Sequence, residues 1–299
     1  MSSEADSRWV AFQKERPLGP GNRGRVSTGV TRQRPTEFEE VSAAPRRATI
    51  LGTPVDRLDM RQSLRQCVDA IESGEYLQHV VVNVAKLIAL QDDESLREIV
   101  HECALINADG QGVVWASRLL GDPLPERVAG IDLMFNLLAL AEQRGFRVYV
   151  LGARAEVLER AVARLRSRYP GLQLAGYRDG YFDESEVEAV CADIRDAQAQ
   201  ILLVAMSSPR KEYFLGEHGT RLGVPFVMGV GGAIDVAAGT TRRAPRILQR
   251  VGLEWLFRLL QEPRRLGPRY LTTNVRFGVL LLGELRLRRR GRFDSAGAA

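Results

Sequence analysis

Residues 107–112 carry the residue types and spacing most suited to chemistry, because an aspartate lies between an apolar run and a turn bracketed by glycines. The apolar residues 103–106 predict a buried strand, and residues 113–120 predict a helix. In an α/β sheet, ligands bind at the carboxyl ends of the strands. Asp109 is therefore a candidate general base. The alternative is that Asp109 only caps the helix that follows.

A second candidate site follows the apolar run 224–230, where Gly229, Gly231 and Gly232 precede a short helical pattern. Glycines at the junction of a strand and a helix let backbone N–H groups approach a phosphate. The same residues also suit a turn that needs a positive φ, and their spacing is not the GxGxxG of dinucleotide-binding folds. Both interpretations stay open from these residues alone.

Two cations lie next to predicted strand ends or stiff loops. Lys211 follows the apolar run 201–205 and begins a short helical pattern, so its ammonium can face a ligand at the sheet edge or only solvent. Arg127 follows a loop with two prolines, one element after Asp109. Its guanidinium has the geometry to neutralise a diphosphate, and it can equally pair with a surface acid.

The rest of the chain alternates strand-like and helix-like patterns from about residue 48 onward, which predicts an α/β fold with a mostly parallel sheet flanked by helices. The strands are apolar almost throughout, as in a sheet that is covered on both faces. Strands are expected at residues 80–83, 103–108, 147–152, 172–177, 201–205 and 224–230, and helices at 86–90, 95–101, 111–120, 131–143, 155–168, 184–197 and 211–218.

Composition limits the class of protein. The 299 residues are 45% hydrophobic and 26% charged, which is ordinary for a soluble globular chain. Three cysteines and three histidines are scattered, with no CxxC and no DxD triplet, so we expect neither disulfides nor a bound metal, and no cofactor. We expect neither a signal peptide nor a transmembrane helix, because no apolar run is long enough, and we expect the protein in the cytoplasm.

Four segments differ in composition. Residues 1–46 are rich in Ser, Arg, Gly, Pro and Glu and are expected to be a disordered leader. Residues 47–245 form the α/β core, residues 246–292 a basic amphipathic appendage, and residues 293–299 a disordered tail.

The positive charge of the chain is concentrated near its C-terminus. Residues 242–292 contain 14 arginines and three glutamates, a net charge of +11, whereas the whole chain has +5 and the remainder therefore −6. Leucines at helical spacing and a tryptophan accompany these arginines. This pattern favours a peripheral, membrane-surface element that docks on anionic lipid. The alternatives are a solvated arginine face over a core helix, or a surface for single-stranded nucleic acid, which we do not expect as a partner.

Taken together, the motifs resemble those of the WecG/TagA/CpsF family of bacterial glycosyltransferases (glycosyltransferase family 26) over about residues 52–271. The motifs stand in the family's order: the strand end at Asn83 and residues 108–115, 125–132, 180–182, 208–212, 229–235, 243–245, 252–255 and 258–265.

The resemblance implies a Rossmann-like fold and an inverting transfer of a hexose-type sugar, such as N-acetylmannosamine or glucose, from a UDP-sugar. The acceptor it implies is linked through pyrophosphate to undecaprenol, at the inner face of the cell membrane, in polysaccharide or exopolysaccharide biosynthesis. It also implies that Asp109 is the catalytic base, that Asn83 lies near the donor and that Arg127 binds a phosphate. The appendage, with Arg258 and Arg265, would dock on the membrane and help to close the site. Members of the family can self-associate, so a homo-oligomer is possible, but the sequence shows no interface for one.

Two positions depart from the family pattern. Val81 stands where the family often has Thr, and Lys211 stands where it commonly has Gln. An ammonium does not replace an amide that reads a hydroxyl, and it favours a phosphate or a carboxylate instead, so the donor sugar is left open. The other two classes of function considered are a membrane-docked scaffold without activity and a nucleotide-binding oxidoreductase, for which the expected GxGxxG pattern is absent.

Overall fold

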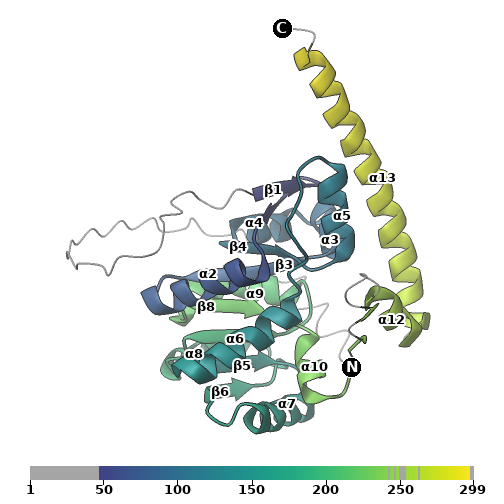
Figure 1. Cartoon of the computed structure of the whole chain (residues 1–299). Coiled ribbons are helices and arrows are strands. Elements are labelled where there is room, and N and C mark those ends of the chain that lie inside the picture. The colour runs from purple at the N-terminus through teal and green to yellow at the C-terminus, as the bar shows by residue number, and fades with distance from the viewer. Residues whose placement is uncertain (1–46, 242, 246, 249–253, 262, 297–299) are drawn as a thin grey trace, which may run out of the picture.

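The computed structural model describes residues 47–241, 243–245, 247–248, 254–261 and 263–296, although some side chains in the last two segments are not described. Figure 1 shows these residues as a layered α/β body with two helices at its C-terminal side. The expected leader, residues 1–46, lies outside the described residues.

The central feature is a sheet of six strands in the order β4-β3-β8-β7-β5-β6, and every neighbouring pair is parallel. This confirms the expected Rossmann-like α/β fold. The strands are β3 Leu77–Val82, β4 Leu105–Ala108, β5 Arg147–Gly152, β6 Gln173–Arg178, β7 Ile201–Ala205 and β8 Phe226–Gly229.

Both faces of the inner strands β5, β7 and β8 are buried, which explains why these strands are almost wholly apolar, whereas the edge strand β6 is half-buried or exposed along its length. Along β7, Leu202 and Val204 belong to one buried cluster, whereas Ile201, Leu203 and Ala205 belong to the other. This is the alternation of period two that a pleated strand imposes. The first cluster is covered by α3 Val84–Asp92, α4 Glu94–Glu102, α5 Gln111–Leu119, α8 Val187–Asp196 and α9 Arg210–His218, and the second by α2 Met60–Ser73, α6 Gly130–Arg144, α7 Ala155–Arg168 and α10 Ala233–Ala238.

The sequence patterns located most elements but left residues 53–79 unassigned. That segment holds strand β2 Thr53–Asp56, which pairs antiparallel with β1 Arg47–Ile50, and helix α2. A capping box starts α2, because Asp59 accepts from the Gln62 backbone N–H while the Gln62 side chain accepts from the Asp59 N–H. This D-x-x-Q signature is legible in the sequence. Two short 3-10 turns, η1 Glu184–Glu186 and η2 Gly219–Leu222, complete the described core.

The appendage consists of α12 Glu254–Gln261 and α13 Pro263–Ala296, and α13 runs along α3 and continues past the body (Figure 1). Phe277 and Leu281 of α13 are buried in the first cluster. Glu284 accepts a hydrogen bond from the Leu51 N–H at 2.8 Å, so the helix is attached to the core by polar as well as apolar contacts. Helix α13 includes residues 293–296, which the sequence pattern assigns to a tail.

Among the described helices, none combines the length and the apolar character needed to cross a bilayer.

A buried histidine makes the stability of this core depend on pH. The His79 Nε2 lies 3.1 Å from Asn107 Oδ1, and Asn107 Nδ2 donates to Ser63 Oγ at 3.0 Å. Burial lowers the pKa of His79 to about 4, although the hydrogen bond to Asn107 opposes this shift. In the unfolded chain the same imidazole takes up a proton near its ordinary pKa of 6.5, so acid favours the unfolded state.

We therefore expect the free energy of unfolding to fall as the pH drops from about 6.5 to 4, with His79 contributing roughly 2–3 kcal/mol of this loss by pH 4.5. Urea unfolding of the native protein and His79→Gln at pH 7 and pH 4.5 measures the contribution. A pH dependence as steep in His79→Gln as in the native protein would contradict this assignment.

Candidate functional site

The ends of β3 and β4 bring Asp109 and Asn83 together. The register pairs Val82 with Ala108, and the Asp109 N–H donates to the Val82 carbonyl at 2.8 Å. A Cβ at Gly110 would lie 3.5 Å from the Asn83 Cβ, so the turn after β4 lies within van der Waals contact of that side chain. Asp109 is half-buried, and the N-cap position of α5 belongs to Gly110 rather than to Asp109. A half-buried carboxylate therefore lies where the sequence pattern predicts a general base.

Asn83 has a structural role at this position. Its Oδ1 accepts a hydrogen bond from the Lys86 N–H at 2.9 Å and caps the N-terminus of α3, and the residue is exposed. The cap fixes the side-chain oxygen. Binding of the donor by Asn83 stays a prediction.

Arg127 approaches the same strand end from the loop between α5 and α6. The Val128 N–H donates to the Ala108 carbonyl at 3.0 Å, so Asp109 and Arg127 are each one residue away from this bond. The Glu126 carboxylate, on the other side of Arg127, accepts from the Met60 N–H at 2.7 Å. The loop is therefore held on both sides of the arginine.

The glycine turn after β8 lies beside β3, its neighbour in the sheet. His79 pairs with Met228, so Asn83 and Gly232 both lie four residues beyond this pair. Gly231 has a φ of +46°, which explains a glycine there.

The turn offers fewer phosphate donors than the sequence suggests. The N–H groups of Val230 and Gly231 donate to Val204 at 2.9 and 3.4 Å, and that of Ala233 donates to Val230 at 3.0 Å. A diphosphate near Gly229, Gly231 and Gly232 would therefore have to be held mainly by side chains.

Lys211 lies beneath this turn in a buried cluster of three charges. Its Nζ lies 2.9 Å from Glu212 Oε1, and the ammonium of Lys86 also pairs with this oxygen. A Cβ at Gly229 would come within 2.8 Å of the Lys211 Cε, so the lysine stem crosses a position that only glycine leaves open. Donor binding by Lys211 stays a prediction, and its ammonium contacts Glu212 in this structure.

The cluster brings two lysines onto one carboxylate under the turn. Burial opposes ionisation of Glu212, but the charges of Lys86 and Lys211 outweigh burial and lower its pKa to about 2. Burial also lowers the pKa of Lys211, although Glu212 opposes this. The carboxylate is thus charged throughout the neutral range, and it stabilises both ammonium groups.

The side chains of Arg258 and Arg265 lie outside the described residues, so the roles expected of them stay predictions. The appendage nevertheless reaches the site, because Arg127 Nη1 donates to Glu254 Oε2 of α12 at 3.1 Å. Arg243 lies on the same carboxylate, with its Nε 3.6 Å from Glu254 Oε1. The sequence motifs include Arg243 and Glu254, but no local pattern in the sequence indicates that Arg127, Arg243 and Glu254 meet.

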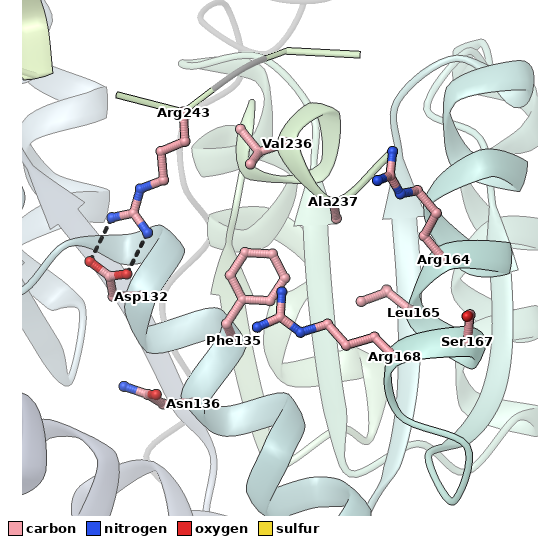
Figure 2. A pocket seen from close by; sticks show the side chains of 10 residues that line it. All are labelled: Asp132, Phe135, Asn136, Arg164, Leu165, Ser167, Arg168, Val236, Ala237 and Arg243. Carbon is pink, nitrogen blue, oxygen red and sulfur yellow. Dashed lines mark hydrogen bonds and ion pairs between the residues drawn. The ribbon is translucent and has the colours of Figure 1, made fainter. Parts of the chain in front are cut away.

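Figure 2 shows a cavity of about 680 Å³ between α6, α7 and α10. The Arg243–Asp132 ion pair lies at one side, and the Arg168 guanidinium lies 4.7 Å from the centre of the Phe135 ring. Asp109, Asn83 and Lys211 are not among its lining residues, but Arg243 is, and Arg243 shares the Glu254 carboxylate with Arg127. Among the described residues, no group of three His, Cys, Asp or Glu is placed to hold a metal ion.

The fold and the site define a Rossmann-like α/β protein. The carboxylate of Asp109, the carboxamide of Asn83 and the loop that carries Arg127 meet at the carboxyl ends of its strands. Residues 48–291 match the model of the glycosyl transferase WecG/TagA/CpsF family, and the chain belongs to this family. The family is one of glycosyltransferases, which implies a nucleotide-sugar donor and a sugar acceptor. This finding favours sugar transfer over the oxidoreductase alternative.

The buried cluster yields a prediction about stability. Glu212→Gln removes the carboxylate and leaves two ammonium groups with only a neutral partner, so we expect the free energy of unfolding to fall by about 3–5 kcal/mol. Glu94→Gln is the matched control, because Glu94 forms an exposed pair with Arg97 and its loss should cost less than about 1 kcal/mol. Urea unfolding of both variants at pH 7 makes the comparison, and equal losses would show that the cluster does not stabilise the fold.

Proposed function

We propose that this protein is an inverting hexosyltransferase that moves N-acetylmannosamine, glucose or a related sugar from a UDP-sugar to an acceptor linked to undecaprenyl pyrophosphate. The reaction would take place at the inner, cytoplasmic face of the cell membrane during the synthesis of a surface polysaccharide. The observation that carries the proposal is the position of Asp109 at the end of β4, beside Asn83 and one backbone hydrogen bond from the Arg127 loop.

Asp109 acts as the general base. Its carboxylate takes the proton of the acceptor hydroxyl while that oxygen attacks the anomeric carbon from the face opposite the nucleotide. The new bond joins the acceptor oxygen to the sugar, the bond from the sugar to the diphosphate breaks, and UDP leaves with the electron pair. Assistance of this kind contributes about 10²–10⁴-fold to the rate.

The charge that develops on the leaving diphosphate needs fixed donors. A guanidinium has five N–H groups, and Arg127 uses one of them on Glu254, so the others can serve the diphosphate. Arg258 and Arg265 of the appendage would add further positive charge. A single well-placed donor contributes about 2.7–4 kcal/mol to such a transition state. Each step uses only protein side chains, the acceptor and the donor.

The buried position of Lys211 supports an indirect role in binding the donor. Its ammonium is held by Glu212 beneath the glycine turn, so it adds positive potential there rather than reading a hydroxyl of the sugar. The position that commonly holds an amide in the family is thus occupied by a group committed to a salt bridge. The donor sugar is to be identified by assay.

The exposed face of α13 supports docking on a membrane. Its exposed apolar residues recur at spacings of four, four and three and form one stripe: Leu271, Val275, Val279 and Leu282. Arg286 and Arg289 are exposed farther along the helix. An amphipathic helix of this kind lies in the interface, and each arginine near anionic lipid contributes roughly 1 kcal/mol. The same stripe is available for self-association, which stays a prediction.

We expect Asp109→Asn to lower turnover by about 10²–10⁴-fold, because the amide cannot accept the proton, while the affinity for UDP changes little. Release of UDP from a panel of UDP-sugars, with purified lipid-linked acceptor, measures turnover, and calorimetry measures the binding of UDP. Asp69→Asn, an exposed change on α2, serves as the control. Near-normal turnover by Asp109→Asn would rule out this base.

We expect the double variant Arg286→Glu/Arg289→Glu to bind anionic vesicles at least about tenfold more weakly than the native protein, because two attractive charges become repulsive. Arg160→Glu/Arg166→Glu makes the same change of charge on exposed positions of α7 and should have a much smaller effect. Sedimentation with vesicles in which about one lipid in three is anionic compares the binding of the two double variants. If both variants lose binding equally, the net charge of the protein and not α13 governs docking.

A further inference from the structure

Four side chains of alternating charge form a chain between the core and the appendage. Arg127 Nη1 donates to Glu254 Oε2 at 3.1 Å, and Glu254 Oε1 lies 3.6 Å from Arg243 Nε. The two terminal nitrogens of Arg243 donate to the two oxygens of Asp132 at 2.6 and 2.7 Å, as Figure 2 shows. Glu254 is therefore the carboxylate between two guanidinium groups.

The chain joins segments that are distant in sequence. Arg127 belongs to the loop before α6, Asp132 to the first turn of α6, Arg243 to the segment after α10, and Glu254 is the first residue of α12. The two central side chains are largely withdrawn from solvent, with 12% of Glu254 and 19% of Arg243 exposed. Partial burial weakens solvent screening, so these charges interact more strongly than a surface pair does.

The order of the contacts determines what each group can do. The bidentate contact with Asp132 fixes the plane of the Arg243 guanidinium. With both terminal nitrogens of Arg243 on Asp132, its Nε faces Oε1 of Glu254. The other oxygen of Glu254, Oε2, contacts Arg127. A free arginine side chain has about 2 kcal/mol of rotamer entropy to lose on binding, and holding one of its nitrogens in place reduces that loss.

We propose that Glu254 is a positioning residue that orients Arg127 for the diphosphate of the donor and makes donor binding depend on the seating of α12. This inference rests on the proposed function, in which Arg127 holds the diphosphate. Glu254 contacts no reacting atom in this scheme and acts through Arg127. The start of the appendage thereby becomes part of the donor site.

A second glutamate of the appendage provides the matched control. Glu284 also ties α13 to the core, because it accepts from the Leu51 N–H at 2.8 Å. It pairs as well with Arg288 of the same helix, whose guanidinium donates to the Leu120 and Thr49 carbonyls of the core, and Arg127 is not among its partners. Glu254→Gln and Glu284→Gln therefore each remove one charged attachment of the appendage. Only the first removes the partner of Arg127.

The experiment uses the full chain and compares Glu254→Gln, Glu254→Asp and Glu284→Gln. Calorimetry gives the Kd for UDP, and turnover of the UDP-sugar that the native protein uses gives KM and kcat. We expect Glu254→Gln to raise the Kd for UDP and the KM for the donor about tenfold while kcat changes less than about threefold. Glu254→Asp should recover part of this affinity, and Glu284→Gln should match the native protein.

A double-variant comparison tests whether Glu254 acts through Arg127. If it does, Glu254→Gln/Arg127→Lys should bind UDP no more weakly than Arg127→Lys alone. Additive losses would overturn the proposal. An unchanged Kd in Glu254→Gln would also overturn it, and so would a lower Kd, which would mean that Glu254 competes with the diphosphate.

The two proposals fail in different ways. A native protein that binds UDP but transfers no sugar would overturn the proposed function, and the comparison of Kd values would still decide the role of Glu254. Equal UDP binding by the native protein and Glu254→Gln, with normal transfer, would overturn only the role of Glu254. A native protein that does not bind UDP would overturn both.

Discussion

Two backbone hydrogen bonds at the end of β4 are the constraint on which the candidate site depends. One joins the Asp109 N–H to β3, and the other joins the Ala108 carbonyl to Val128 of the loop before α6. Together they hold a carboxylate, the end of the neighbouring strand and an arginine-bearing loop at one point of the sheet. Because backbone groups make these bonds, substitutions of Asp109 and Arg127 leave both of them in place. The geometry and the chemistry of the site are therefore separable, which makes variants of these side chains informative.

The charges below the site impose a second constraint. Lys86, Lys211 and Glu212 come from α3 and α9, and their cluster fills the space under the glycine turn of β8. A buried ion pair has to recover the cost of desolvation through close contacts, so its members have little freedom to turn toward a ligand. A lysine in this position acts through its field and through the packing of its stem on Gly229. The sequence around Lys211 thus allows a ligand-facing ammonium, whereas in the fold this ammonium is bound to Glu212.

Local patterns in the sequence predicted the framework well because the framework is local. The bounds of α7 and β7 match the expected ones, since apolar periodicity and the flanking Pro and Gly mark them. The position of Asp109 at a strand end follows from the same reasoning. The capping signal of α2, at Asp59 and Gln62, is local and legible in the sequence as well. The distant partners of Glu212 and Arg127 cannot be found from local patterns, because Lys86 and Glu254 lie 126 and 127 residues away along the chain.

Helix α13 of the appendage packs one face against the core and leaves another face exposed. Phe277 and Leu281 are buried against the core, whereas Leu271, Val275, Val279 and Leu282 are exposed on the same helix. Docking on the core therefore does not consume the surface that would meet a membrane. Helix α12, next to α13, begins with Glu254, and a single residue separates the two helices. If α13 lies on lipid as proposed, the force that seats it acts one short helix away from the carboxylate that holds Arg127. Membrane binding and assembly of the donor site would then depend on the same pair of helices, α12 and α13, so that docking of α13 would itself place Glu254 against Arg127.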